Sequence, residues 1–179
     1  MASFYSSPLL LLLLITPLSF GPAAGDPRTQ DLIYSICRHC ENFEFCYNTF
    51  YENIKTPMAN LESLSQIAIE QSLYNATNTY IFVKKLLEDT SDMEARKNLT
   101  ICDYCYYELM NLFQEAFRSF ALRDFGVMVV YEKQAPAVEE KCEGIFGEDF
   151  FAINPLAERN KEMRMLITMA LVAGSMLVT

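Results

Sequence analysis

The chain has 179 residues, with 23 acidic side chains, 14 basic ones and one histidine, which gives a formal net charge of −9. This balance argues against nucleic-acid binding, because a protein that neutralises phosphates needs a basic face. The single histidine, His39, leaves little room for a catalytic triad, an acid–base pair or a histidine metal site, and we expect it at the surface. The apolar share of 51% suits one packed core and argues against a disordered chain.

An apolar segment at the N-terminus predicts a signal peptide. Six consecutive leucines, residues 9–14, are followed by small residues and by the first charged residue, Asp26. The segment is shorter than the roughly 20 residues that a membrane-spanning helix needs. The pattern indicates cleavage near Ala24 or Gly25, so that residues 1–25 are removed on secretion.

Secretion favours disulfides over a zinc or redox site for the cysteines, and we expect no metal and no cofactor. Four of the six form two Cys-x-x-Cys pairs, which lie too far apart for a compact zinc ribbon. Spacing alone leaves fifteen pairings of six cysteines open. The six are Cys37, Cys40, Cys46, Cys102, Cys105 and Cys142.

Two Asn-x-Thr sequons, at Asn75 and Asn98, are candidate N-glycosylation sites. They agree with passage through a eukaryotic secretory pathway. Because short sequons also arise by chance, they support secretion without establishing it.

Helical periodicity dominates the rest of the chain. In the first segment, apolar or small residues recur every three or four positions, and in the second the spacing alternates strictly between four and three, as in the seam of a left-handed bundle. Pro136 interrupts the third segment and should bend it. Asn154 and Pro155 are suited to cap and begin the fourth. The four segments are residues 58–89, 102–120, 125–145 and 154–179.

Four helical segments joined by short polar breaks predict an all-α fold, an antiparallel four-helix bundle over residues 57–179. Residues 26–56 contain shorter helical pieces rich in aromatic side chains. They are too few for a second domain, so we expect one domain, residues 26–179, with the shorter pieces as an appendage of the bundle.

Two apolar features are better explained by packing than by a binding site. Tyr106, Phe113 and Phe120 follow the heptad spacing of the second segment, which places them in the core rather than along a ligand channel. Residues 165–179 are almost wholly apolar but too few to span a membrane, so they predict a buried closing helix.

No group of residues predicts catalysis. The cluster Glu139, Glu140 and Glu143 is expected to be a solvated helix face rather than a cation site. The sequence also offers no nucleophile, base and oxyanion donor together. We therefore interpret the chain as a binding protein and not as an enzyme.

Four short sequence words occur in a characteristic order with two cysteine pairs, one of the form Cys-x8-Cys and one that encloses about forty residues. Together they resemble the plant invertase/pectin methylesterase inhibitor family over essentially the whole mature chain. Each word is short, but their order and spacing are specific. The words are Cys102-x-x-x-Tyr106, Asp124-Phe125, Cys142-Glu143-Gly144-Ile145-Phe146, and Asn154-Pro155-Leu156 with Asn160.

The resemblance implies a four-helix bundle with an N-terminal helical hairpin and two disulfides, Cys37–Cys46 and Cys102–Cys142. Loop-closure entropy assigns the two bridges about 2.7 and 4 kcal/mol of stability.

Cys40 and Cys105 have no counterpart in the four-cysteine framework of the family. We expect them either to form a third bridge between hairpin and bundle, which is the alternative we favour, or to remain buried thiols.

The resemblance also implies a function and a partner. Members of the family form stoichiometric complexes that block the active cleft of pectin methylesterase or of β-fructosidase (invertase). Invertase-directed members share a Pro-Lys-Phe word near the start of the third bundle helix, where this chain has Arg123-Asp124-Phe125-Gly126. This difference favours pectin methylesterase as the partner, with invertase as the alternative, and an extracellular, cell-wall location rather than a vacuolar one. No membrane or nucleic-acid partner is expected.

Other interpretations remain open at this point: a binder without inhibitory activity, a secreted helical signalling ligand and, least favoured, a secreted hydrolase. The acidic balance predicts electrostatic steering towards a basic esterase. It also predicts an affinity that changes between about pH 5 and pH 7.5, where perturbed carboxylates titrate.

Overall fold

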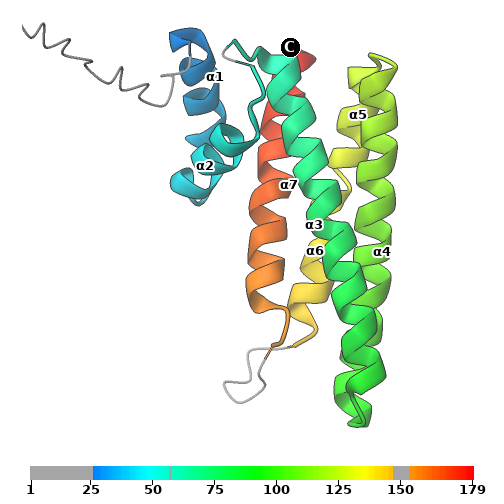
Figure 1. The fold of residues 1–179 in the computed structure, drawn as a ribbon. Helices are drawn as coiled ribbons and strands as arrows, with labels where there is room; N and C mark the ends of the chain where they lie inside the picture. The colour runs from blue at the N-terminus through cyan, green and yellow to red at the C-terminus, as the bar shows by residue number, and fades with distance from the viewer. Residues whose placement is uncertain (1–25, 57, 147–153) are drawn as a thin grey trace, which may run out of the picture.

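The computed structural model describes residues 26–56, 58–146 and 154–179, and the predicted signal peptide lies outside these ranges. Within them the chain forms helices and no strands, which confirms the all-α prediction (Figure 1). The helices are α1 (Pro27–Cys37), α2 (Phe43–Asn53), α3 (Leu61–Asp89), α4 (Met93–Ala121), α5 (Phe125–Glu132), α6 (Ala135–Gly144) and α7 (Ala157–Leu177).

Helices α3 and α4 are the longest, with 29 residues each, and they run antiparallel as the main pair of a four-helix bundle (Figure 1). Helix α7 packs on α3, while α5 and α6 follow one another along α4 and together form the remaining member of the bundle. Tyr106, Phe113, Leu64, Ile69 and Met163 are among the largest fully buried side chains. The bundle prediction is therefore confirmed, and so is the core position of Tyr106 and Phe113, whereas Phe120 is only partly buried.

Polar side chains cap the N-termini of the two long helices. The side chain of Asn60 accepts a hydrogen bond from the backbone N–H of Ser63 (2.9 Å), and that of Asp92 accepts one from Ala95 (2.7 Å). Such N-caps satisfy backbone donors that the first helical turn leaves free. They explain why α3 and α4 start where they do.

The predicted start of the last helix is wrong by a few residues. Asn154 does not cap a helix that begins at Pro155; its Oδ1 accepts a hydrogen bond from the N–H of Leu156 (2.8 Å) in a turn, and α7 begins at Ala157. The reason is that an Asn side chain can close a local turn with the backbone two residues ahead. The first helical carbonyl is that of Leu156, which accepts from the N–H of Asn160.

The interruption predicted in the third segment is confirmed. The segment divides into α5 and α6 at Lys133 and Gln134, and Pro136 lies in the first turn of α6. A proline fits there because the first helical N–H groups have no partner within the helix.

The C-terminal segment is a buried closing helix, as predicted. Its residues Met169, Ala170, Ala173 and Gly174 are buried in the bundle. In the described part of the chain, no helix is both long and apolar enough to cross a membrane.

A polar junction in the core joins three helices. A disulfide links Cys102 of α4 to Cys142 of α6, the pairing that the family resemblance implies. The hydroxyl of Tyr106 donates to Oδ1 of Asn160 on α7 (2.8 Å), and Sγ of Cys142 lies 3.6 Å from the same oxygen. Because Asn160 is fully buried, this hydrogen bond replaces the solvation that its Oδ1 has lost, whereas its Nδ2 is buried without a partner.

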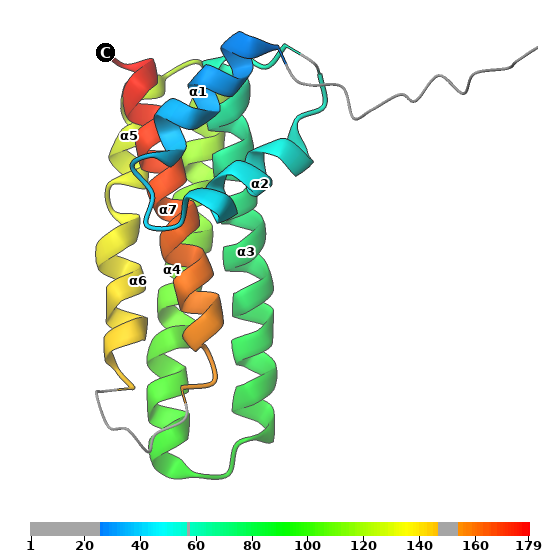
Figure 2. The ribbon, with the colours of Figure 1, turned by 90° about the vertical axis from the view of Figure 1, so that its left-hand side faces the viewer.

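The hairpin of α1 and α2 lies across α7 and α3 (Figure 2). Its disulfide, Cys37–Cys46, is again the one that the resemblance implies. Cys37, Cys46, Ile36 and Phe50 are fully buried, so one face of the hairpin belongs to the core.

The third bridge that we favoured is absent: Cys40 and Cys105 are free thiols. Cys40 follows α1 in the hairpin, which packs on α3 and α7, whereas Cys105 is on α4, which packs on α3, α5 and α6 (Figures 1 and 2). The two thiols therefore belong to different sides of the bundle. Burial raises the pKa of Cys40 to about 11 and also raises the pKa of Cys105, so both are poor nucleophiles.

Gly174 gives a test of the packing of α5 on α7. A Cβ at this position would overlap the carboxylate of Glu132 and the terminal methyl of Met128, whereas a Cβ at Gly144 would meet nothing. We predict that Gly174→Ala lowers the free energy of unfolding by about 1–3 kcal/mol. Chemical denaturation would measure the change. Gly144→Ala is the control; a loss as large in this variant would contradict the packing argument.

Candidate partner-binding surfaces

The described residues hold no group of three or more His, Cys, Asp or Glu side chains that could bind a metal ion.

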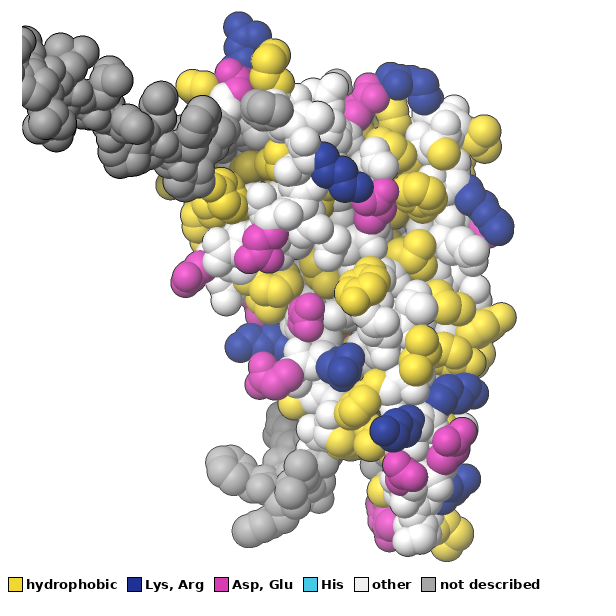
Figure 3. All heavy atoms as spheres, in the orientation of Figure 1, with side chains coloured by type: hydrophobic (Ala, Val, Ile, Leu, Met, Phe, Trp, Pro, Cys, Tyr) yellow, Lys and Arg dark blue, Asp and Glu magenta, His cyan; other side chains and the backbone are white. Residues whose placement is uncertain are grey.

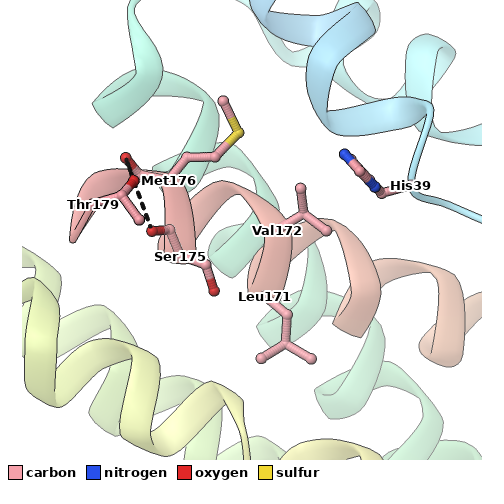
Figure 4. Close-up of a pocket in the computed structure, with 6 residues that line it drawn as sticks. All are labelled: His39, Leu171, Val172, Ser175, Met176 and Thr179. Atoms are coloured by element: carbon pink, nitrogen blue, oxygen red, sulfur yellow. Dashed lines mark hydrogen bonds between the residues drawn. The ribbon is translucent and has the colours of Figure 1, made fainter.

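An open depression between the hairpin and the end of α7 is mainly apolar, and its polar groups do not form a convergent set (Figure 4). In it, Thr179 Oγ1 lies 3.5 Å from the main-chain oxygen of Ser175. His39 is exposed at its edge, as predicted. The outer surface is therefore the candidate for the contact with a partner.

Exposed aromatic and aliphatic side chains gather over α3 and α4 (Figure 3). On α4, Tyr104 and Tyr107 are three residues apart and are 65% and 47% exposed. On α3, Tyr74 and Ile81 are seven residues apart, which places both on one side of the helix. Tyr80 connects the two helices, because its ring lies 5.8 Å from that of Tyr107. We call Tyr74, Tyr80, Ile81, Tyr104 and Tyr107 the tyrosine face.

An ion pair orders the centre of the tyrosine face. Lys84 Nζ lies 2.9 Å from a carboxylate oxygen of Asp103 and 5.2 Å from the centre of the Tyr80 ring. These contacts hold Tyr80 against Tyr107 before any partner binds. Tyrosines held in this way can supply large contact area at low entropic cost, which is typical of protein interfaces.

A second exposed aromatic group lies on the hairpin. Tyr34 of α1 packs edge-on against Phe43 of α2 (5.1 Å), and Phe43, Tyr47 and Tyr51 stack at intervals of 6.1 Å along α2. We call these four rings the aromatic ladder. Because its rings pack on one another, part of their apolar surface is already covered.

The residues Arg123 to Gly126 span the turn between α4 and α5 and the first two residues of α5. Arg123 has a positive φ of 59°, and its guanidinium makes two hydrogen bonds to the carboxylate of Glu62 (2.7 and 3.0 Å) and lies 5.5 Å from the centre of the Phe125 ring. Asp124 caps α5 by accepting from the N–H of Val127 (3.2 Å). The word therefore fixes the geometry of this end of the bundle.

Arg164 of α7 connects three elements that are distant in sequence. Its guanidinium binds Glu41, in the turn of the hairpin (3.1 and 3.3 Å), and Glu143, on α6 (2.6 and 2.7 Å). The hydrogen bond from Arg164 lowers the pKa of the Glu41 carboxyl. Helical periodicity does not reveal this contact, because it depends on how the hairpin docks on α7.

The prediction that Glu139, Glu140 and Glu143 form a solvated face is wrong for Glu139. This side chain is only 3% exposed, while Glu140 is exposed and Glu143 is partly exposed. The physical reason is that α6 packs against both α4 and α7, so that a residue next to an exposed one turns inward. Burial raises the pKa of Glu139 to about 7.

The two sequons differ in exposure. Asn75 is only 7% exposed, it faces the cleft between α2, α3 and α7, and its Oδ1 is buried without a hydrogen-bond partner. Asn98 is partly exposed in the first turns of α4. A glycan on Asn75 would have to displace α2 or α7, whereas one on Asn98 would project from the end of the bundle.

We predict that the chain, expressed through a eukaryotic secretory pathway, carries a glycan on Asn98 and none on Asn75. Asn98→Gln should lower the mass of the intact protein by one glycan. Asn75→Gln should leave the glycan mass unchanged. Mass spectrometry of both variants would decide, and a glycan that disappears with Asn75 would contradict the prediction.

Comparison with known proteins defines the class. Residues 31–172 match the family described as plant invertase/pectin methylesterase inhibitor. The chain belongs to this family, whose members are inhibitors, so it is not an enzyme.

Individual relatives are distant. A protein of Platanus acerifolia named "Putative invertase inhibitor" is 24% identical over 157 residues, covering 83% of this chain and 87% of the relative. A pectinesterase inhibitor of Actinidia deliciosa is 23% identical over 145 residues, covering 81% and 77%. The crystal structure of mutant form A of a pectin methylesterase inhibitor from Arabidopsis matches with a TM-score of 0.72 at 19% identity, covering 80% of this chain and 95% of that one. The structural match shows that the fold is shared.

Proposed function

We propose that this chain is a secreted inhibitor that forms a stoichiometric complex with pectin methylesterase and blocks its active cleft. The main support for this proposal is the match to the inhibitor family over residues 31–172. A pectinesterase inhibitor among the relatives agrees with it. The predicted signal peptide and the two disulfides support an extracellular location.

The choice of target rests on the turn between α4 and α5. This turn carries Arg123-Asp124-Phe125-Gly126 in place of the Pro-Lys-Phe word of invertase-directed members. Invertase is the second candidate, because the Platanus acerifolia relative carries an invertase-inhibitor name.

Parallel titrations of the folded protein into a plant pectin methylesterase and a plant invertase distinguish the two targets. We expect esterase activity to fall to a minimum at one inhibitor per enzyme, with invertase unaffected. Loss of invertase activity alone would assign the second target. Loss of neither activity would contradict the proposed function.

The tyrosine face is the surface that we propose for the contact. Tyr104 and Tyr107 are exposed, lie side by side on one rigid helix, and can enter a cleft without reorganisation of the bundle. Truncation of either should weaken binding by about 1–2 kcal/mol, or roughly tenfold in Kd.

We predict that Tyr104→Ala weakens inhibition of pectin methylesterase about tenfold, while Tyr34→Ala on the aromatic ladder leaves it unchanged. The two tyrosines are 65% and 62% exposed, so the pair controls for loss of an exposed ring. Inhibition constants and unfolding midpoints of both variants should be measured together. If Tyr34→Ala weakened inhibition and Tyr104→Ala did not, the contact would lie on the hairpin instead.

A further inference from the structure

Two buried carboxylates flank the break between α5 and α6. Glu132 is the last residue of α5 and is 1% exposed, and Glu139 lies in the middle of α6 and is 3% exposed. Pro136 lies between them. The proposed inhibitory contact uses neither carboxylate.

Glu132 is enclosed without any polar partner. Both of its carboxylate oxygens are buried and make no hydrogen bond. One oxygen points at Gly174 of α7, with the side chain of Met128 beside it. Burial alone raises the pKa of Glu132 to about 8, with no neighbouring charge contributing.

Glu139 is surrounded by charges of both signs. Burial is the largest cause of its raised pKa, and Glu143 and Glu140 of α6 and Glu41 of the hairpin turn raise it further, while Arg164 of α7 lowers it. One of its carboxylate oxygens is buried without a hydrogen bond.

On the side of α4, Glu139 acts on two further titratable groups, Cys105 and Tyr106, whose pKa values are raised mainly by burial and further by the charge of Glu139. The charge of Lys141 on α6 lowers the pKa of Cys105. Arg164, the cation that lowers the pKa of Glu139, is already hydrogen-bonded to Glu41 and Glu143. An ionised Glu139 therefore has no cation of its own.

We propose that α5 and α6 form a pH-sensitive segment of the bundle, which packs firmly on α4 and α7 while Glu132 and Glu139 are protonated and loosens when they ionise. An ionised carboxylate buried without a partner is strongly unfavourable, so ionisation has to be accompanied by access of water. The break at Lys133 and Gln134, where α5 ends and α6 begins, allows α5 and the first turns of α6 to move without unfolding α3 or α4, while the Cys102–Cys142 disulfide keeps the end of α6 on α4.

The direction of the effect follows from proton linkage. The pKa of each carboxyl is higher in the folded chain than the ordinary value of 4.5, so the folded state binds more protons than the unfolded one. The stability that the two protonated carboxyls contribute is fully present below about pH 4.5 and is lost as the pH rises to about 8. The segment is thus firm at acidic pH and loose at mildly alkaline pH.

Glu132→Gln/Glu139→Gln removes both ionisations with little change in shape, and Glu88→Gln, which removes an exposed carboxylate on α3, is the control. Between pH 5 and pH 8 the folded-to-unfolded ratio of the wild type should fall at least about tenfold more than that of the double variant. The control should follow the wild type. Chemical denaturation at a series of pH values measures all three proteins.

Hydrogen exchange of the wild-type chain locates the change, after correction for the intrinsic pH dependence of exchange. We expect amides of α5 and α6 to lose protection between pH 5 and pH 8, while those in the centre of α3 keep theirs. Protection that is unchanged, or that falls equally in all helices, would overturn the proposal. So would a double variant that folds and has the pH profile of the wild type. Because these measurements use the isolated inhibitor, their outcome is independent of which enzyme it binds.

Discussion

The buried hydrogen bond between Tyr106 and Asn160, beside the Cys102–Cys142 bridge, is the constraint on which the rest of the structure depends. It joins α4, α6 and α7 at one point in the core. Without this bond, the Tyr106 hydroxyl and Oδ1 of Asn160 would both be buried and unsatisfied, so the bond favours the observed position of α7 relative to α4. Burial raises the pKa of Tyr106 well above its usual range, so its hydroxyl remains a donor at every physiological pH. The position of α7 in turn determines where Arg164 can hold the hairpin and how closely α5 approaches Gly174.

A bundle held together in this way presents rigid outer surfaces, and a protein inhibitor needs such a surface more than it needs a pocket. Within the tyrosine face, Tyr80 already packs against Tyr107 and under Lys84, so these two rings would lose little conformational entropy on binding. By contrast, the two unpartnered carboxylates, Glu132 and Glu139, concentrate local instability in the α5–α6 segment. Stability is thus distributed unevenly: α3, α4 and α7 form the frame, and the segment between them responds to protons.

The sequence predicts the helices well because their pattern is local. The spacing of apolar residues places α3 and most of α4, although α4 begins at Met93, before the predicted segment of residues 102–120, and Pro136 marks the division of the third segment. The features that it misses depend on tertiary arrangement. Glu139 and Glu140 are adjacent acidic residues on one helix, and only the packing of α6 against its neighbours makes one of them buried. The free thiols have the same explanation, since their pairing depends on which side of the bundle the hairpin covers.

We propose that this chain acts as an inhibitor by forming a one-to-one complex that covers the active cleft of pectin methylesterase. A titration in which bound fraction and residual esterase activity are determined in the same samples, with light scattering to give the mass of the complex, tests this directly. We expect activity to fall in proportion to the enzyme bound, and the complex to have the mass of one inhibitor and one esterase. A complex that retains full activity, or a mixture in which the two proteins remain separate, would contradict it.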